Sequence, residues 1–229
     1  ADRAGCAVSV AARGGVDYKS AFDELFLSPI SRLMRIRELL TTGRPCFSFE
    51  FFPPKDDTGF AQLRETLATL RELQPSFVSV TYGAGGTTRL RTLDLVTNIK
   101  RDYGLEAMAH LTCVGASRGE ILQVLEQLRD ARVENVLALR GDPPQGDPSF
   151  VAHPDGFAHA SDLAAFVRKY FNFCIGGACY PEGHVEAASR DVDLVNLGLK
   201  LEAGCEFLIS QLFFDNQHYF DFVGRARAM

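Results

Sequence analysis

The stretch CFSFEFFPPKDDTGFAQLRETLATLRELQP (46–75) has the pattern of one β-strand followed by one α-helix. Phenylalanine alternates with other residues through 46–51, as expected for a strand with two different faces. After two prolines, apolar residues recur at the spacing of an amphipathic helix that ends at Pro75: Phe60, Leu63, Leu67 and Leu70. The stretch therefore predicts one βα unit.

The same pattern recurs along the chain. Five further segments are typical of strands: SFVSVTYG (76–83), EAMAHLTC (106–113), NVLALRG (135–141), FNFCIGGACY (171–180) and EFLISQLFF (206–214). Helical patterns lie between them, at 92–104, 117–133, 161–171 and 193–204. Strand starts are separated by roughly 30 residues, the length of a βα unit. The sequence predicts an α/β fold with a parallel sheet, either an open sheet or a (β/α)8 TIM barrel of which about six units are present.

Composition excludes several classes of protein. The 229 residues are 46% hydrophobic, which allows a large core, and the net charge of −5 gives no basis for binding nucleic acid. No run of 18 apolar residues predicts a membrane span. The six cysteines form no CxxC pair, and most lie in apolar segments, so we expect reduced thiols and a cytoplasmic location.

Residues 1–29 are expected to be an N-terminal extension to a domain spanning 30–229. They contain Arg3, Arg13 and Lys19 among small residues but no long apolar segment, so a secretory signal is not expected. A mobile extension and a residual organelle-targeting segment, which would place the protein in an organelle matrix, both remain open.

Polar residues lie at the ends of all six predicted strands. In chain order they are Glu50, Thr81 with Tyr82, His110 with Thr112, Arg140 with Asp142, Tyr180, and Gln211. Ligands of parallel βα folds bind at the carboxyl ends of the strands. These residues therefore predict a ligand site at that end of the sheet.

Glu50 has two interpretations. In the strand 46–51 the three phenylalanines face one side, and Ser48 and Glu50 face the other. In a barrel, Glu50 would lie at the mouth of the interior, where burial should raise its pKa and make it a general acid near neutral pH. The alternative is a structural glutamate in a salt bridge at a strand end.

Other features also have a structural and a functional interpretation. The loop YGAGGTT (82–88) matches neither a P-loop nor GxGxxG, so it is a flexible connection or a place where backbone approaches a phosphate or ring. His110 is a core histidine or, with Cys113, Cys174 and Cys179, a zinc ligand of unspecific spacing. Lys200 shares a helix face with Asp193 and Asn196, which favours an exposed ion-pair surface or a binding surface.

Seven motifs in order resemble the 5,10-methylenetetrahydrofolate reductase family over about residues 30 to 223: FSFEFFPPK, SVTYGAGG, HLTC, LRGDPP, YPEGHVEA, DLVNLGLKLEAG and SQLFFD. The resemblance implies a flavin-containing (β/α)8 barrel whose last two strands are missing from this chain. It implies that FAD passes electrons from NADH or NADPH to methylenetetrahydrofolate in a ping-pong cycle, which yields 5-methyltetrahydrofolate. No metal is implied.

The resemblance also implies residue roles. Glu50 takes the position of the general acid, Asp142 that of an aspartate near flavin and folate, and Gln211 that of a folate contact. The implied flavin contacts are Thr81, Tyr82, Ala84, His110, Arg140, Gly141, Asp142, Ala160, Tyr180, His184, Asp193, Asn196 and Lys200.

The sequence is therefore consistent with three functions: an active reductase, a non-catalytic structural or assembly subunit with the same scaffold, and a zinc- or thiol-dependent methyl-transfer barrel. Because a barrel with six units would expose strand edges, a homo-oligomer or association with other chains is expected in addition.

Overall fold

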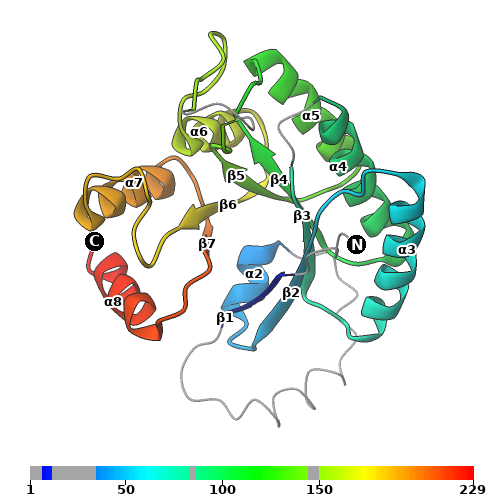
Figure 1. Ribbon diagram of the computed structural model, residues 1–229, viewed down its shortest axis with the longest axis horizontal. Helices are drawn as coiled ribbons and strands as arrows, with labels where there is room; N and C mark the ends of the chain where they lie inside the picture. Colours follow the sequence, from blue (N-terminus) through cyan, green and yellow to red (C-terminus); the bar gives the residue numbers. More distant parts are fainter. Residues whose placement is uncertain (1–6, 12–34, 83–85, 144–149) are drawn as a thin grey trace. The chain divides into compact units, whose positions relative to one another are not determined.

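The computed structural model describes residues 7–11, 35–82, 86–143 and 150–229. The described strands are β1 (Ala7–Ala11), β2 (Cys46–Phe51), β3 (Phe77–Val80), β4 (Ala107–Thr112), β5 (Asn135–Leu139), β6 (Cys174–Cys179) and β7 (Phe207–Ser210). The described helices are α2 (Ile36–Thr41), α3 (Asp57–Glu72), α4 (Gly86–Asn98) with the π-helical turn η1 (Ile99–Tyr103), α5 (Arg118–Asp130), α6 (Ala160–Tyr170), α7 (Arg190–Glu202) and α8 (Asn216–Arg227). Figure 1 shows the alternation of strands and helices.

All six predicted strands are confirmed, as β2 to β7. Their hydrogen-bonded order in the sheet is the order of the sequence, and the strands are parallel. A doubly wound open sheet reverses its strand order at a switch point, whereas a (β/α)8 barrel adds each strand beside the previous one. The fold is therefore of the TIM-barrel type, with six parallel strands described.

Strand β1 was not predicted. It pairs antiparallel with β2, with Ala7 opposite Glu50 and Ala11 opposite Cys46. Five small and apolar residues carry too weak a periodicity to predict a strand alone, and the pairing depends on the free backbone groups along the edge of β2. The predicted boundary at residues 29 and 30 lies outside the described residues.

The five predicted helices are confirmed with shifted ends, and α2 and α8 were not predicted. Helix α6 starts at Ala160, and the carboxylate of Asp162 accepts a hydrogen bond from the backbone N–H of His159 at 3.0 Å. Helix α7 starts after Ser189, whose hydroxyl accepts from the N–H of Val192 at 3.2 Å. Both contacts satisfy backbone donors that a helix start leaves unpaired.

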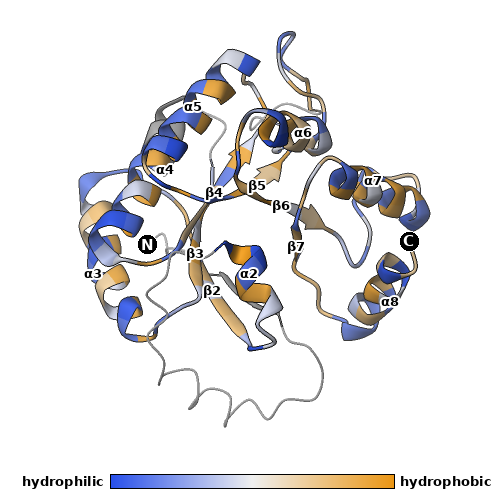
Figure 2. Cartoon of the chain, turned by 180° about the vertical axis from the view of Figure 1, so that it is seen from behind, coloured by the Kyte–Doolittle hydropathy of each residue, from blue (hydrophilic) through white to orange (hydrophobic). Residues whose placement is uncertain are grey.

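The described residues form two compact units, and each is described by itself. Unit 1 contains the described residues up to Leu111 together with the later segment Gly119–Val136. Its core combines the apolar faces of α3 and α5 with the strands between these helices. Leu67 of α3, Val78 of β3 and Leu125 of α5 are each 1% exposed or less. Figure 2 shows hydrophobic and hydrophilic residues alternating along these helices. This pattern is why they bury one side only.

Unit 2 contains Thr112–Arg118 and Leu137–Met229. Its core includes Leu163 and Val167 of α6 and Ile175 of β6, all fully buried. A Cβ on Gly176 of β6 would lie 2.5 Å from the ring of Phe207 on the neighbouring strand β7. The glycine therefore leaves the space that the ring of this phenylalanine occupies beside the backbone of β6.

The described cysteines are free thiols, and all are buried: Cys46, Cys113, Cys174, Cys179 and Cys205. Burial raises the pKa of the Cys113 thiol to about 11 and that of Cys179 to about 12. Both groups are therefore protonated at neutral pH and behave as small apolar core residues rather than as nucleophiles.

Candidate active site and cofactor cavity

In unit 1, Glu50 lies near the carboxyl end of β2 beside two polar side chains. Its register partner on β3 is Ser79, whose hydroxyl donates to Oε2 of Glu50 at 3.4 Å. The Nε2 atom of His110, on β4, lies 3.3 Å from the same oxygen. Three neighbouring strands thus bring a carboxyl, a hydroxyl and an imidazole together, and Ser79 was missed by the sequence analysis.

Burial sets the protonation of this group. It raises the pKa of Glu50, against a smaller lowering by the hydrogen bond from Ser79. It lowers the pKa of His110 to about 4. The imidazole is therefore neutral at pH 7, and the short distance between the two side chains is not an ion pair.

Burial therefore favours the protonated form of Glu50. Its side chain is 31% exposed, so it reaches solvent or substrate, whereas that of His110 is 8% exposed. Within the described part of the chain, Nε2 of His110 has no well-oriented hydrogen-bond partner. The predicted rise in the pKa of Glu50 is confirmed, and the arrangement suits a general acid.

Replacing His110 by Gln should flatten the acid limb of the stability profile. Because the pKa of His110 falls from 6.5 to about 4 on folding, the neutral ring contributes stability above pH 6.5 that is lost as the pH falls toward 4. The full contribution is about 3 kcal/mol. Urea unfolding across this pH range should show a loss in the unaltered chain that is smaller by this amount in H110Q. Equal slopes would contradict the burial of a neutral ring.

Thr81 and Tyr82 follow β3 and are half-buried. The N–H of Thr81 donates to the carbonyl of Phe51 at 2.9 Å, and its own carbonyl accepts from the hydroxyl of Thr92 at 2.9 Å. The backbone of Thr81 is thus fixed beside the end of β2. Ala84, a predicted flavin contact, lies outside the described residues.

Unit 2 contains a cavity of about 300 Å³ at the carboxyl ends of its strands. Seven of the residues predicted to contact flavin line it: Arg140, Ala160, Tyr180, His184, Asp193, Asn196 and Lys200. The lining also includes His159, Ser161 and Glu186, which the sequence analysis did not assign. The predicted common face of Asp193, Asn196 and Lys200 on α7 is confirmed, and it faces this cavity rather than forming an isolated ion-pair surface.

The amine of Lys200 is held inside this cavity. It donates to the carbonyl of Ala178 at 2.8 Å and lies 5.4 Å from the ring centroid of Tyr180. Burial lowers the pKa of Lys200, and the charge of Asp193 opposes this shift. Asp193 in turn accepts from the N–H of His184 at 3.2 Å. The cavity therefore has a partly desolvated cation beside an aromatic face and a buried carboxylate.

Arg140 supplies a second cation. Its guanidinium lies 4.8 Å from the ring centroid of Phe150 and forms an ion pair with Glu186. The next residue, Gly141, has φ +87°, and a Cβ there would lie 2.7 Å from the side chain of Val114. Only glycine therefore fits at this turn after β5.

Asp142 and Gln211 are exposed and do not line the cavity. The side-chain oxygen of Gln211 accepts from the N–H of Leu212 at 2.9 Å, and its backbone N–H donates to the carbonyl of Cys179 at 2.7 Å. Both residues follow their strands as predicted. Their roles as substrate contacts, and that of Asp142 in tuning flavin, stay predictions.

The residues around the cavity fit the phosphate and nucleoside parts of a flavin dinucleotide. Arg140 and Lys200 supply cations for phosphate, Asp193 and Asn196 can bond sugar or base groups, and Tyr180 offers an aromatic face. The turn at Gly141 has the positive φ that lets backbone approach a ligand closely.

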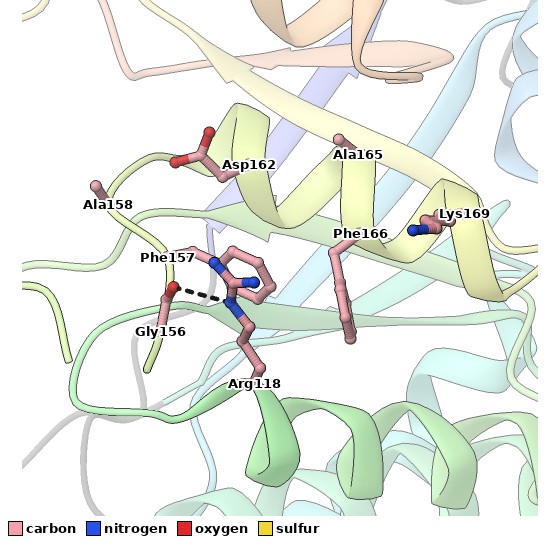
Figure 3. Close-up of a pocket in the computed structure, with 8 residues that line it drawn as sticks. All are labelled: Arg118, Gly156, Phe157, Ala158, Asp162, Ala165, Phe166 and Lys169. Carbon is pink, nitrogen blue, oxygen red and sulfur yellow. Dashed lines mark hydrogen bonds between the residues drawn. The ribbon is translucent and has the colours of Figure 1, made fainter. Parts of the chain in front are cut away.

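A second, more open cavity of about 580 Å³ lies along α6. Figure 3 shows Arg118 beside Phe157, with its Nε donating to the carbonyl of Gly156 at 3.4 Å. The guanidinium lies 5.2 Å from the centroid of the Phe157 ring. Lys169 lines the same cavity, but no residue predicted from the sequence to bind a ligand does.

Across 7–11, 35–82, 86–143 and 150–229, no helix is long and apolar enough to cross a membrane. Within the same ranges, no group of three or more His, Cys, Asp or Glu side chains could hold a metal ion. Among these residues, His110, Cys113, Cys174 and Cys179 therefore form no metal-binding group.

Comparisons with known proteins agree with the motifs. Residues 35–229 match the profile of the family described as Methylenetetrahydrofolate reductase. The chain is 37% identical over 206 residues to "Methylenetetrahydrofolate reductase (NADH) 1" of Arabidopsis thaliana, which covers 84% of this chain and 34% of that protein. It is 40% identical over 188 residues to "5,10-methylenetetrahydrofolate reductase" of Pectobacterium carotovorum, which covers 81% of this chain and 60% of that protein. The chain thus spans about a third to three fifths of these relatives.

A solved structure supports the fold. The crystal structure of a lyase/mutase-type protein from Burkholderia cenocepacia J2315 matches with a TM-score of 0.55 at 19% identity. The match covers 83% of this chain and 68% of that one. At this level of identity the likeness concerns the arrangement of strands and helices only.

Proposed function

The chain belongs to the methylenetetrahydrofolate reductase family, and from this premise we propose that it reduces 5,10-methylenetetrahydrofolate to 5-methyltetrahydrofolate with FAD as cofactor. The observation that carries the proposal is the cavity of unit 2, which is lined by seven of the residues that the resemblance assigns to flavin. NADH is the first electron donor to test because the Arabidopsis relative is named for it. NADPH is the alternative donor.

The residues of unit 2 would bind and orient the cofactor. Arg140 and Lys200 would neutralise its phosphates, and the partial burial of Lys200 would strengthen that attraction because less water screens it. Asp193 and Asn196 would form hydrogen bonds with its sugar and base groups. When bound, FAD would supply the hydride chemistry between the nicotinamide donor and the folate.

Glu50 would supply the proton. In its protonated form, favoured by burial, it donates a proton to the nitrogen that leaves the methylene bridge of the folate, which opens the bridge to the 5-iminium cation. Neutral His110 adds no positive charge beside the carboxyl group, so the acid stays protonated at higher pH than it would beside an imidazolium.

The first test uses the absorption spectrum. The purified 229-residue chain is mixed with FAD, separated from free FAD and treated with NADH without oxygen. We expect a flavin spectrum that bleaches and that returns on addition of methylenetetrahydrofolate. A chain that remains colourless after addition of FAD would overturn the proposed cofactor and favour a non-catalytic subunit.

Replacing Lys200 by Met should weaken FAD binding by about 10- to 100-fold, because a charged hydrogen bond is worth about 1.5–3 kcal/mol. Fluorescence titration of FAD measures the dissociation constant. Lys169→Met is the matched control, since Lys169 is an exposed lysine of the same unit outside this cavity. Equal losses in both variants would contradict the role of Lys200.

A further inference from the structure

Glu186 holds the two terminal nitrogens of Arg140. Nη2 of Arg140 donates to Oε1 of Glu186 at 2.8 Å, and Nη1 donates to Oε2 at 2.5 Å. This pair joins the segment after β5 to the segment after β6, and both residues line the cavity of unit 2. The two nitrogens that would bind a phosphate side by side are therefore already bound to a carboxylate.

The backbone around Glu186 is fixed. Its N–H donates to Nδ1 of His184 at 3.1 Å, and the N–H of Ala187 donates to the carbonyl of His184 at 2.9 Å. The carboxylate itself is only partly covered, since its side chain is 52% exposed, against 23% for Arg140. Glu186 can thus turn into water by side-chain rotation alone, without rearrangement of the loop.

Arg140 has a second support that remains when Glu186 leaves. Its guanidinium lies 4.8 Å from the centroid of the Phe150 ring. Stacking on an aromatic face leaves the edge of the guanidinium free for hydrogen bonds. The arginine can therefore exchange one anion for another.

We propose that Glu186 is an internal competitor for the anion site on Arg140. A phosphate of the ligand must displace the Glu186 carboxylate in order to bind there. The identity of that ligand as FAD rests on the proposed function. While the cavity is empty, the carboxylate supplies the charge that Arg140 needs. When a phosphate arrives, Glu186 returns to water at little cost because exposed ion pairs are weak.

The test compares Glu186→Gln with the unaltered chain in titrations with FAD and with inorganic pyrophosphate. Removing the competitor should tighten binding of both by about two- to fivefold, the range given by exposed ion pairs. Glu182→Gln is the control, because it removes the same charge from the same segment, where Glu182 contacts His218 at 3.1 Å instead. It should change neither titration. Unchanged or weaker binding by E186Q would overturn the proposal and make Glu186 a support for Arg140.

A double-variant cycle separates displacement from a general charge effect. In an Arg140→Met background, Glu186→Gln should no longer tighten pyrophosphate binding, and a gain that persists would overturn the proposal. The two proposals also fail separately. If FAD does not bind the unaltered chain but E186Q tightens pyrophosphate binding, the cofactor assignment fails and the competition stands. If pyrophosphate binds neither chain, the competition fails.

Discussion

Glu50→Gln should lower the rate of methylenetetrahydrofolate reduction by about 10²- to 10⁴-fold, the usual contribution of a general acid. Reduction of bound FAD by NADH should keep its rate, because that half of the cycle needs no proton from this residue. Glutamine keeps the size of the side chain and can still accept the hydrogen bond that Ser79 donates. Rapid mixing without oxygen measures the two half-reactions separately.

The pH dependence adds a second readout. Because burial raises the pKa of Glu50, the protonated acid persists above the ordinary range of a glutamate and is lost as the pH rises through the raised value. The rate of the folate step should fall over that range in the unaltered chain, and E50Q should lack this decline. Glu65→Gln, at an exposed position of α3, is the control. Equal losses in both half-reactions of E50Q would indicate a structural role instead.

The sequence predicted the parts of the fold that depend on local periodicity. The helical spacing of Leu63 and Leu67 places apolar side chains on the buried side of α3, and both leucines are buried. The spacing of Asp193, Asn196 and Lys200 also fixes one helix face without knowledge of the neighbours. Each of these features depends on residues of one helix or strand, so the sequence of that element is enough to predict it.

Features that depend on pairing between distant segments were missed. Ser79 reaches Glu50 because β2 and β3 pair in one register, which no residue of either strand specifies alone. Glu186 lies in the quoted motif YPEGHVEA, but its partner Arg140 is 46 residues away. A charge scan could have found an acid near the predicted cations. It could not have identified Arg140 as the partner.

The burial of Lys100 was also not predicted, because a lysine on a helix is usually exposed. Lys100 lies in the predicted helix 92–104, and in the structure it is a buried residue of the π-helical turn η1. It follows the buried Val96 by four residues, so the two residues lie on the same face of the helix. Lys100 is 8% exposed, whereas the side chain of its neighbour Arg101 is 66% exposed.

The buried network around Lys100 predicts a large loss of stability. Its amine lies 3.1 and 3.3 Å from the two carboxylate oxygens of Glu106. Asn135 donates to the same carboxylate at 2.7 Å and accepts from the N–H of Ile36, at the start of α2, at 2.8 Å. Burial raises the pKa of Glu106, and the charge of Lys100 opposes that shift. The positive charge of Lys100 therefore stabilises the buried carboxylate of Glu106 inside unit 1.

Lys100→Met should lower the free energy of unfolding by about 3–5 kcal/mol, because it leaves a buried carboxylate without its cation. Urea unfolding monitored by circular dichroism measures this loss. Arg101→Met is the matched control one residue away, where the partner Asp102 is exposed, and it should leave the unfolding midpoint unchanged. Equal shifts in both variants would mean that the helix end, and not the charge pair, is sensitive.

The double variant Lys100→Met with Glu106→Gln decides the cause. If the loss of stability in Lys100→Met comes from the unpaired charge, neutralising Glu106 should recover a large part of it. Glutamine keeps an oxygen that can accept the hydrogen bond from Asn135. If the loss comes from packing of the lysine stem, the second substitution should add to it. Recovery would show that removing one charge of this buried ion pair destabilises unit 1 more than removing both charges.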